Sequence, residues 1–238
     1  MANQTETLGK AVGYRWLAQF FLHRPGLADL RRYRDEDGRH FLAACKAVPA
    51  LAPLAELIEA AVATEEGLAH LQAALARATG EAFDRAGPRT APPYASVYLS
   101  ERGLLFQQPT RDMNRILGLL KMNLPEGLNE PADHLGIQLN VAAELCDREA
   151  AGEPFSVSSV LFLETQVLSW LPAFVERCSR LPEPGLVCML AHSALNLVQA
   201  HVEAGHVKPA DPVKVEALAR VALQLVCMNY KAAEAYCK

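Results

Sequence analysis

Apolar residues recur along most of this chain at the spacing of an α-helix. Near the N-terminus, Leu8, Val12, Trp16 and Phe20 form one stripe, which the stretch 23–26 (HRPG) ends. Similar stripes predict further helices over 28–34 and 39–47, from about 53, 65 and 110, over 130–150, from about 156, and over 184–204 and 211–235. No alternation of strands and helices indicates a parallel sheet. The pattern therefore predicts an all-α protein, a single helical domain of roughly ten helices.

Residues with strong positional preferences mark several of these helix ends. Thr64 and Thr110 are predicted to be N-caps, because a hydroxyl there can accept a hydrogen bond from a free backbone amide. Pro172 is expected to kink or restart the helix that begins near 156. Asp211 and Pro212 are expected to open the last helix, as its cap and its first residue.

Two loops divide the predicted helices. The stretch from Gly87 to Pro93 holds three prolines and one glycine, which predicts a hinge loop between an N-terminal lobe (about 1–86) and a C-terminal lobe (about 94–238). Residues 96–106 alternate only loosely, so we expect an extended segment or a short helical turn there. A second loop is expected over 123–129. Because hinge loops allow protomers to exchange lobes, we expect a monomer with a possible domain-swapped dimer.

Composition excludes several classes of protein. The chain has 238 residues, of which 51% are hydrophobic, so a sizeable core is possible. A net charge of −4 argues against nucleic acid as the main partner. We see no signal peptide, and no run approaches the roughly 18 apolar residues of a membrane span, so no stable membrane insertion is expected. The six cysteines form no C-x-x-C pair, which favours reduced thiols in the cytoplasm over a metal site.

The start of the predicted helix over 130–150 carries polar side chains. If Glu130 is the cap, Pro131 is the first helical residue and Asp133 the third, where a carboxylate can accept free backbone amides. Alternatively, Asp133 faces a groove and pairs with a guanidinium of a partner, and both interpretations can hold at once. His134 lies about 100° further around the helix and, taken alone, is typical of a surface or satisfied histidine.

Two tyrosines follow the prolines of the first loop. Tyr94 and Tyr98 either fill the core between the lobes or line a groove for an apolar peptide with their hydroxyls near water. Ser96 is a candidate cap of the following turn, and Trp170 is a core candidate. The chain contains no phosphate loop, no G-x-S-x-G and no H-x-x-x-H, which lowers the expectation of an enzyme or a metal site.

Three segments together resemble a known signature: PYASVYL at 93–99, EPADHLG at 130–136, and the apolar positions from Phe162 through Trp170 to Phe174. They resemble the TorD/DmsD family of redox-enzyme maturation chaperones. The resemblance implies a cytoplasmic, all-helical chaperone with no cofactor of its own. It implies as partner the apo catalytic subunit of a molybdenum oxidoreductase, often bound through its twin-arginine signal peptide and held until the molybdopterin cofactor is inserted.

The same resemblance implies a client-binding region, in which Asp133 and His134 are expected to matter most. The full expected set is Glu130, Pro131, Asp133, His134, Tyr94, Ser96, Tyr98, Gln138, Gln166 and Trp170. The DmsD branch tends to have tryptophan where this chain has its two tyrosines, and family members often carry histidine near the position of Gln166. Because of these differences, the resemblance does not identify the subfamily or the client enzyme. The alternatives are an all-helical nucleotide-binding regulator or enzyme, and a helical scaffold without a molybdoenzyme client.

Overall fold

The computed structural model describes residues 2–23, 25–83, 87, 89–124, 127–153 and 157–207. Within these residues the regular secondary structure is helical, apart from one isolated bridge between Tyr94 and His134, so the all-α prediction is confirmed. The α-helices are α1 (Ala2–Leu22), α2 (Leu27–Arg31), α3 (Glu36–Lys46), α4 (Ala52–Val62), α5 (Glu65–Arg77), α6 (Ala95–Leu99), α7 (Gln108–Leu120), α8 (Leu135–Ala150), α9 (Ser159–Phe162), α10 (Leu171–Ser179) and α11 (Gly185–Val207). Three short helical segments of other types accompany them: the 3₁₀ helix η1 (Arg32–Arg34) and the π-helices η2 (Ala78–Phe83) and η3 (Leu163–Val167). The helix predicted over 211–235 lies outside the described residues.

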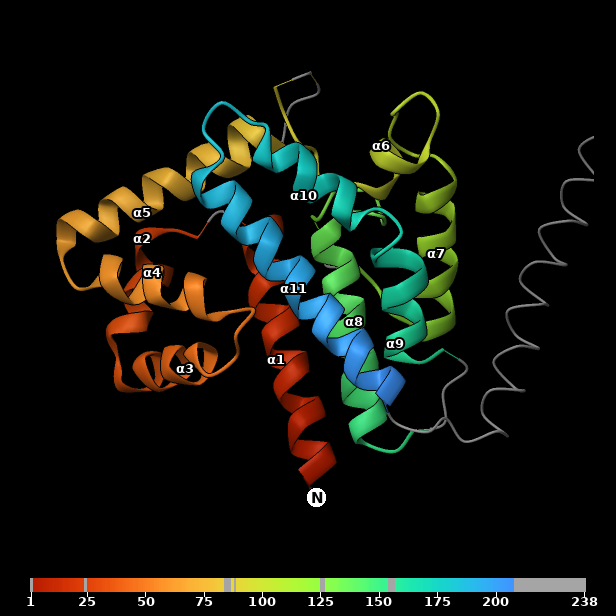
Figure 1. The fold of residues 1–238 in the computed structure, drawn as a ribbon, viewed down its shortest axis with the longest axis horizontal. Helices are drawn as coiled ribbons and strands as arrows, with labels where there is room; N and C mark the ends of the chain where they lie inside the picture. The colour runs from red at the N-terminus through yellow and green to blue at the C-terminus, as the bar shows by residue number, and fades with distance from the viewer. Residues whose placement is uncertain are drawn as a thin grey trace, which may run out of the picture.

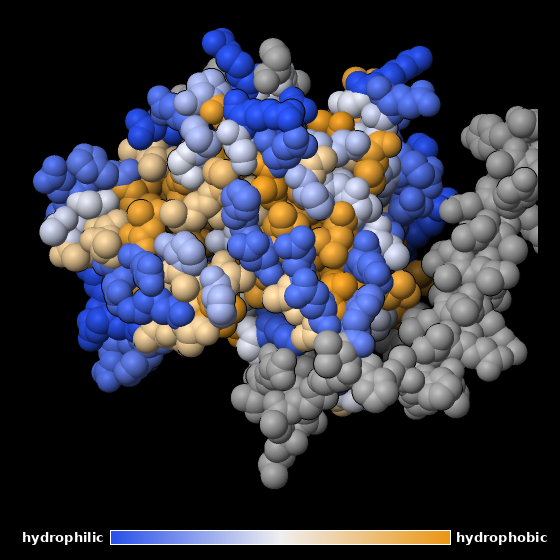
Figure 2. All heavy atoms as spheres, in the orientation of Figure 1, coloured by the Kyte–Doolittle hydropathy of each residue, from blue (hydrophilic) through white to orange (hydrophobic). Residues whose placement is uncertain are grey.

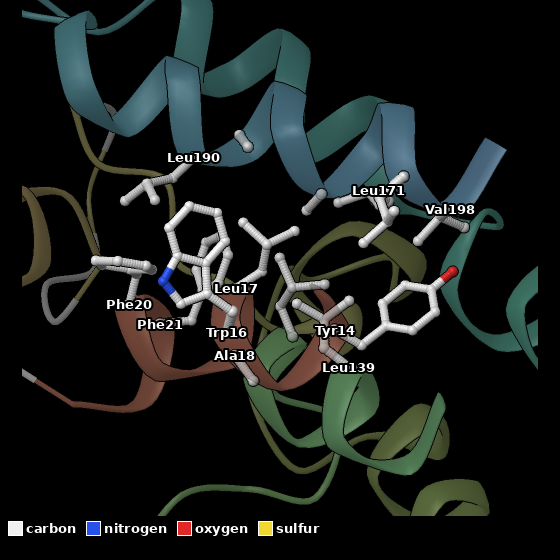
Figure 3. Packing of buried hydrophobic residues seen from close by; sticks show 14 of the residues in the cluster. Tyr14, Trp16, Leu17, Ala18, Phe20, Phe21, Leu139, Leu171, Leu190 and Val198 are labelled. Carbon is white, nitrogen blue, oxygen red and sulfur yellow. The ribbon is translucent and has the colours of Figure 1, made fainter. Parts of the chain in front are cut away.

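Helices α1 and α8 form the centre of the fold, and α11 packs against α1 (Figure 1). The two central helices approach closely because α8 carries Gly136 at the crossing. A Cβ there would lie 2.5 Å from Cγ of Leu22 and 3.1 Å from the carbonyl oxygen of Ala18. Figure 3 shows the core that results, in which rings of α1 such as Tyr14 meet aliphatic side chains of the other helices such as Leu139. This contact places the end of α1 beside the start of α8.

The remaining helices flank this centre. Helices α2 to α5 lie together on one side, and α6 and α7 on the other (Figure 1). One hydrophobic cluster runs through both sets, from Leu30 and Leu54 to Leu120, and it also includes Phe174 of α10. The division into two lobes at the loop after residue 86 stays a prediction.

Several predicted boundaries are confirmed. Thr64 is the N-cap of α5, and its hydroxyl accepts a hydrogen bond from the amide of Gly67 at 3.0 Å. The chain restarts as α10 with Pro172 in its first turn. Residues 95–99 form the short helix α6, which was one of the two expected forms of this segment.

Two predicted helix starts are wrong. Helix α7 begins at Gln108 with Pro109 in its first turn, so Thr110 lies inside the helix and is not its cap. Helix α8 begins at Leu135, because His134 takes the N-cap position. Glu130 and Pro131 therefore lie in the preceding loop.

Helix α11 corrects the expectation about apolar runs. Its residues Gly185–His206 are long and apolar enough, by length and composition, to cross a membrane, with a mean hydropathy of 1.3. Half of this stretch is buried inside the fold, where Leu190 and Val198 pack against the other helices (Figure 3). Figure 2 shows the mixed surface on this face, with hydrophilic residues prominent toward its edges. Such burial is typical of the core helix of a globular fold.

The described cysteines are free thiols. Cys45, Cys146 and Cys178 are buried and Cys188 is partly exposed, while the remaining two cysteines lie outside the described residues. Burial raises the pKa of Cys45 to about 11 and the pKa values of Cys146 and Cys178 to about 12. These three therefore act as small apolar side chains of the core.

Candidate functional site

The carboxylate of Asp133 lies inside the protein and not in a groove. Its side chain is fully buried, with 0% exposure. Oδ2 accepts a hydrogen bond from the amide of Ser96 at 2.7 Å, and Oδ1 accepts one from the hydroxyl of Thr110 at 2.7 Å. The expectation that Asp133 faces a groove and meets a partner's guanidinium there is therefore wrong. Asp133 instead ties the start of α6 and the first turn of α7 to the loop before α8.

Ser96 completes this buried cluster. Its hydroxyl lies 3.2 Å from the hydroxyl of Thr110 and accepts a hydrogen bond from the amide of Gln107 at 3.3 Å. The residue is the second of α6 and is fully buried, so it is not the cap of a surface turn. The polar groups of the cluster satisfy one another, as buried polar groups must.

His134 is also buried, with 3% exposure. Its Nδ1 accepts a hydrogen bond from the amide of Gly136 at 3.1 Å, which requires the neutral imidazole with its proton on Nε2. Burial lowers the pKa of His134 to about 3, so the ring stays neutral at physiological pH. This buried, capping histidine matches the plainer of the two interpretations of the residue, a structural role.

The loop before α8 pairs with the extended segment before α6. The amide of Leu135 donates to the carbonyl of Pro93 at 2.8 Å, and the amide of Ala95 donates to the carbonyl of Asp133 at 3.2 Å. Beside this bridge, the ring of Tyr94 meets that of His134 edge to face, with centroids 5.0 Å apart. Two of the three segments of the signature are thus brought together in space.

Among the described residues of this loop, Glu130 is a carboxylate that remains partly exposed. Its Oε2 accepts a hydrogen bond from the hydroxyl of Tyr94 at 2.6 Å, which orients the side chain. The hydroxyl of Tyr94 therefore reaches the edge of the site, whereas Pro131, next to Glu130, is buried.

A cavity of about 680 Å³ opens beside Glu130. Its walls come from the end of α1, the end of α7, the loop before α8 and the first turns of α8. Apolar side chains form much of the lining, and its described residues include no lysine or arginine: Leu22, His23, Leu117, Met122, Asn123, Leu124, Gly127, Leu128, Asn129, Glu130, Ile137, Asn140 and Val141. We call this space the Glu130 cavity. A partly apolar chamber with one anionic group among its described lining residues suits a peptide that is both apolar and cationic.

Four other expected site residues form a separate cluster behind α6. The ring of Tyr98 stacks on that of Trp170 with centroids 5.5 Å apart, and the indole nitrogen of Trp170 donates to Oε1 of Gln138 at 3.0 Å. The amide nitrogen of Gln138 reaches the carbonyl of Gln166 at 3.4 Å. Trp170 and Gln138 are 1% exposed, so they pack in the core and do not line a groove.

The hydroxyl of Tyr98 is buried and has no hydrogen-bond partner among the described residues. Burial raises its pKa well above the usual value for tyrosine. The expectation that this hydroxyl stays near water is therefore wrong, and the ring fills the core as the alternative interpretation had it.

Sequence reasoning missed two contributors to the site. The sequence pattern predicts Thr110 as a helix cap. Pro109 prefers the first helical turn, however, and this preference indicates that α7 begins before Thr110. The apolar wall of the Glu130 cavity includes Leu22, Leu117 and Ile137 from three different helices. Their meeting depends on helix packing, which no local pattern reveals.

Within the described part of the chain, no group of three or more His, Cys, Asp or Glu side chains is placed to hold a metal ion.

Comparison with known proteins places the chain in a family. Residues 44–176, more than half of the chain, match the family model described as nitrate reductase delta subunit. The chaperone protein TorD of Vibrio cholerae (strain ATCC 39315) is 32% identical over 80% of this chain and 89% of that protein. TorD of Ferrimonas balearica is 32% identical over 79% of this chain and 86% of that protein, and TorD of Aliivibrio salmonicida is 28% identical over 82% and 93%. These relatives are named chaperones and not enzymes, and the chain belongs to the TorD/DmsD family of redox-enzyme maturation chaperones.

Proposed function

We propose that this protein is a cytoplasmic chaperone for one molybdenum oxidoreductase. It binds the apo catalytic subunit through a twin-arginine signal peptide and holds it until the cofactor is inserted. Family membership supports the chaperone role. The observation that carries the proposed mode of binding is the Glu130 cavity, whose described lining combines apolar side chains with one carboxylate, Glu130, at a partly exposed position.

The chemistry of a twin-arginine leader matches this cavity. The leader offers two adjacent guanidinium groups followed by an apolar, helix-forming stretch. The apolar stretch packs against the walls that Leu22, Leu117 and Ile137 provide, as in other helix-in-groove complexes. One guanidinium pairs with the carboxylate of Glu130, which the hydroxyl of Tyr94 holds in place at 2.6 Å. Asp133 supports this arrangement from inside and does not touch the client.

The first test replaces Glu130 by glutamine, which keeps an acceptor for the hydroxyl of Tyr94 but removes the charge. Glu130→Gln is expected to weaken binding of a synthetic peptide, Arg-Arg followed by a Leu/Ala stretch, by about tenfold, because a partly desolvated ion pair is lost. Isothermal titration calorimetry measures the affinity. Circular dichroism checks that the helix content is unchanged.

Glu153→Gln is the matched control, since Glu153 is an exposed carboxylate just after α8 that does not line the cavity. Unchanged affinity of Glu130→Gln for the peptide would show that Glu130 is not the arginine partner. A peptide with Gln-Gln in place of Arg-Arg is expected to lose the same factor in the wild-type protein. That peptide is also expected to be insensitive to the Glu130 substitution.

The nucleotide-binding alternative has no specific support in the site, and the relatives are named chaperones. A pull-down from extract of the source cells is expected to retain a molybdoenzyme precursor preferentially. Recovery of unrelated proteins in equal amounts would favour a general helical scaffold.

A further inference from the structure

A second cavity, of about 550 Å³, lies between α1 and the η1–α3 segment. We propose that this cavity binds a basic side chain of the client leader, located on the N-terminal side of the arginine pair. We call it the aromatic cavity, because the rings of Trp16, Phe20, Tyr33 and Phe41 all line it. The proposal rests on the proposed function and adds a subsite to it.

The rings form a wall of fixed geometry. Trp16 meets Phe20 and Phe41 edge to face, with centroids 5.7 and 5.5 Å apart, and its indole nitrogen donates to the hydroxyl of Tyr33 at 2.8 Å. Trp16 and Phe20 are buried and form the floor, while Tyr33 and Phe41 are partly exposed and present ring surface to the cavity. A cation placed against such a face is attracted by the ring quadrupole.

A glycine sets the spacing of this wall. A Cβ on Gly38 would lie 2.1 Å from the carbonyl oxygen of Arg32 and 2.6 Å from the Cα of Tyr33. Only glycine therefore lets α3 approach η1 so closely, and that approach brings Phe41 alongside Tyr33, with centroids 6.4 Å apart. Glycine inside a helix lowers the stability of that helix by about 1 kcal/mol relative to alanine, and the close packing at Gly38 offsets this loss.

The described lining of the cavity carries excess negative charge. Among these described residues, Asp29, Asp35 and Asp37 stand against one cation, Arg32, which is an excess of two negative charges. The carboxylate of Asp29 is engaged, since it accepts the amide of Gly26 at 3.0 Å. Among the residues that the structure describes, Asp35 and Asp37 make no ion pair and no side-chain hydrogen bond. Aromatic faces with two uncommitted carboxylates complement a guanidinium or ammonium group.

The aromatic cavity adjoins the Glu130 cavity. His23, the exposed residue after α1, lines both. The apolar part of the leader follows its arginine pair and occupies the walls of the Glu130 cavity. The chain on the other side of the pair is therefore free to pass His23 and reach Asp35 and Asp37.

The test compares two model leaders that differ at one position. Both carry Arg-Arg and a Leu/Ala stretch, and one has Lys and the other Gln a few residues before the arginines. The wild-type protein is expected to bind the Lys form at least about threefold more tightly at low salt, because surface ion pairs are screened by added ions. Asp35→Asn with Asp37→Asn is expected to abolish this preference. Asparagine preserves the capping position of Asp35.

Glu56→Gln with Glu66→Gln is the matched control, with the same change of charge on exposed positions of α4 and α5 that do not line the cavity. The control is expected to keep the preference for Lys. A preference that survives in the double Asn variant overturns the subsite. In that case a loss of affinity in Glu130→Gln still supports the proposed function.

A second measurement does not need the leader. Acetyl-Arg-Arg-amide, which has no apolar part, is expected to shift the ring resonances of Tyr33 and Phe41 in NMR spectra of the wild-type protein but not of the double Asn variant. If neither model leader binds, the proposed function fails and this titration alone decides on the subsite. Absence of shifts in the wild-type protein overturns it.

Discussion

At the scale of single residues, burial decides what the signature residues do. Asp133 and His134 are the residues that the sequence analysis expects to matter most for client binding. Both are nevertheless buried and hydrogen-bonded to neighbouring groups. Glu130, three residues before Asp133, keeps partial exposure and lines a cavity. The contacts of the buried pair hold that cavity's loop in position, and the partly exposed Glu130 is the acid that we propose meets the client.

Asp133→Ala is expected to lower the free energy of unfolding by about 3 kcal/mol, because it leaves the amide of Ser96 and the hydroxyl of Thr110 without their acceptor. Urea denaturation followed by circular dichroism measures this change. Thr110→Val, which removes one of the two donors, is expected to have a smaller effect. A variant of unchanged stability that no longer binds the model leader would contradict a purely internal role for Asp133.

His134 predicts a pH dependence of stability. Burial lowers its pKa to about 3 in the folded protein, whereas the unfolded chain has the ordinary value of about 6.5. Below about pH 6.5 the unfolded state therefore binds a proton that the folded state does not, and stability falls by up to about 1.4 kcal/mol per pH unit until about pH 3. His134→Asn retains a side chain suited to the N-cap and is expected to flatten this slope.

Urea denaturation of both proteins between about pH 7 and about pH 4 gives the two slopes. His40→Asn, at an exposed position of α3, is the matched control for loss of a histidine. Equal slopes in the wild-type protein and His134→Asn would mean that the buried ring takes up its proton without unfolding.

At the scale of elements, the crossing of α1 and α8 determines where the Glu130 cavity forms. The crossing brings Leu22 and His23, at the end of α1, against the first turns of α8. The same end of α1 contributes Phe20 and His23 to the aromatic cavity. A shift of this one helix end therefore alters both cavities.

Gly136→Ala is expected to destabilise the protein by about 1–3 kcal/mol, since the added Cβ would lie 2.5 Å from Leu22 and 3.1 Å from the backbone of Ala18. Thermal unfolding monitored by circular dichroism tests this. Gly118→Ala is the control: a Cβ at this position in α7 meets nothing within 4 Å, so alanine is expected to stabilise the helix by about 1 kcal/mol. If Gly136→Ala is as stable as the wild-type protein, the crossing is looser than the structure indicates.

At the scale of the whole molecule, the loops at 87–93 and 123–129 are the places where we predict, from their sequence, that the chain exchanges parts between copies. A monomer with a minor domain-swapped dimer is expected, because hinge loops permit the exchange without new contacts. Size-exclusion chromatography with light scattering measures the two populations. A single dimeric species at all protein concentrations would contradict this prediction.

The sequence by itself determined the class of the fold and most of the helices. Helical periodicity is local, and caps such as Thr64 and first-turn prolines such as Pro172 act within one turn, so they can be read without tertiary information. The resemblance of the segments around Tyr94 and Glu130 likewise led to the family. The periodicity failed at the start of α8, where an expected helical turn became a loop.

Only the tertiary structure decided which signature residues are accessible. The exposure of Asp133, Glu130 and Tyr98 depends on contacts with residues far away in the chain, such as Thr110 and Trp170. The two cavities also form between helices that are distant in sequence. Burial is a property of the packed assembly of helices, so a pattern within one segment cannot distinguish an acid that holds the core from an acid that meets a partner.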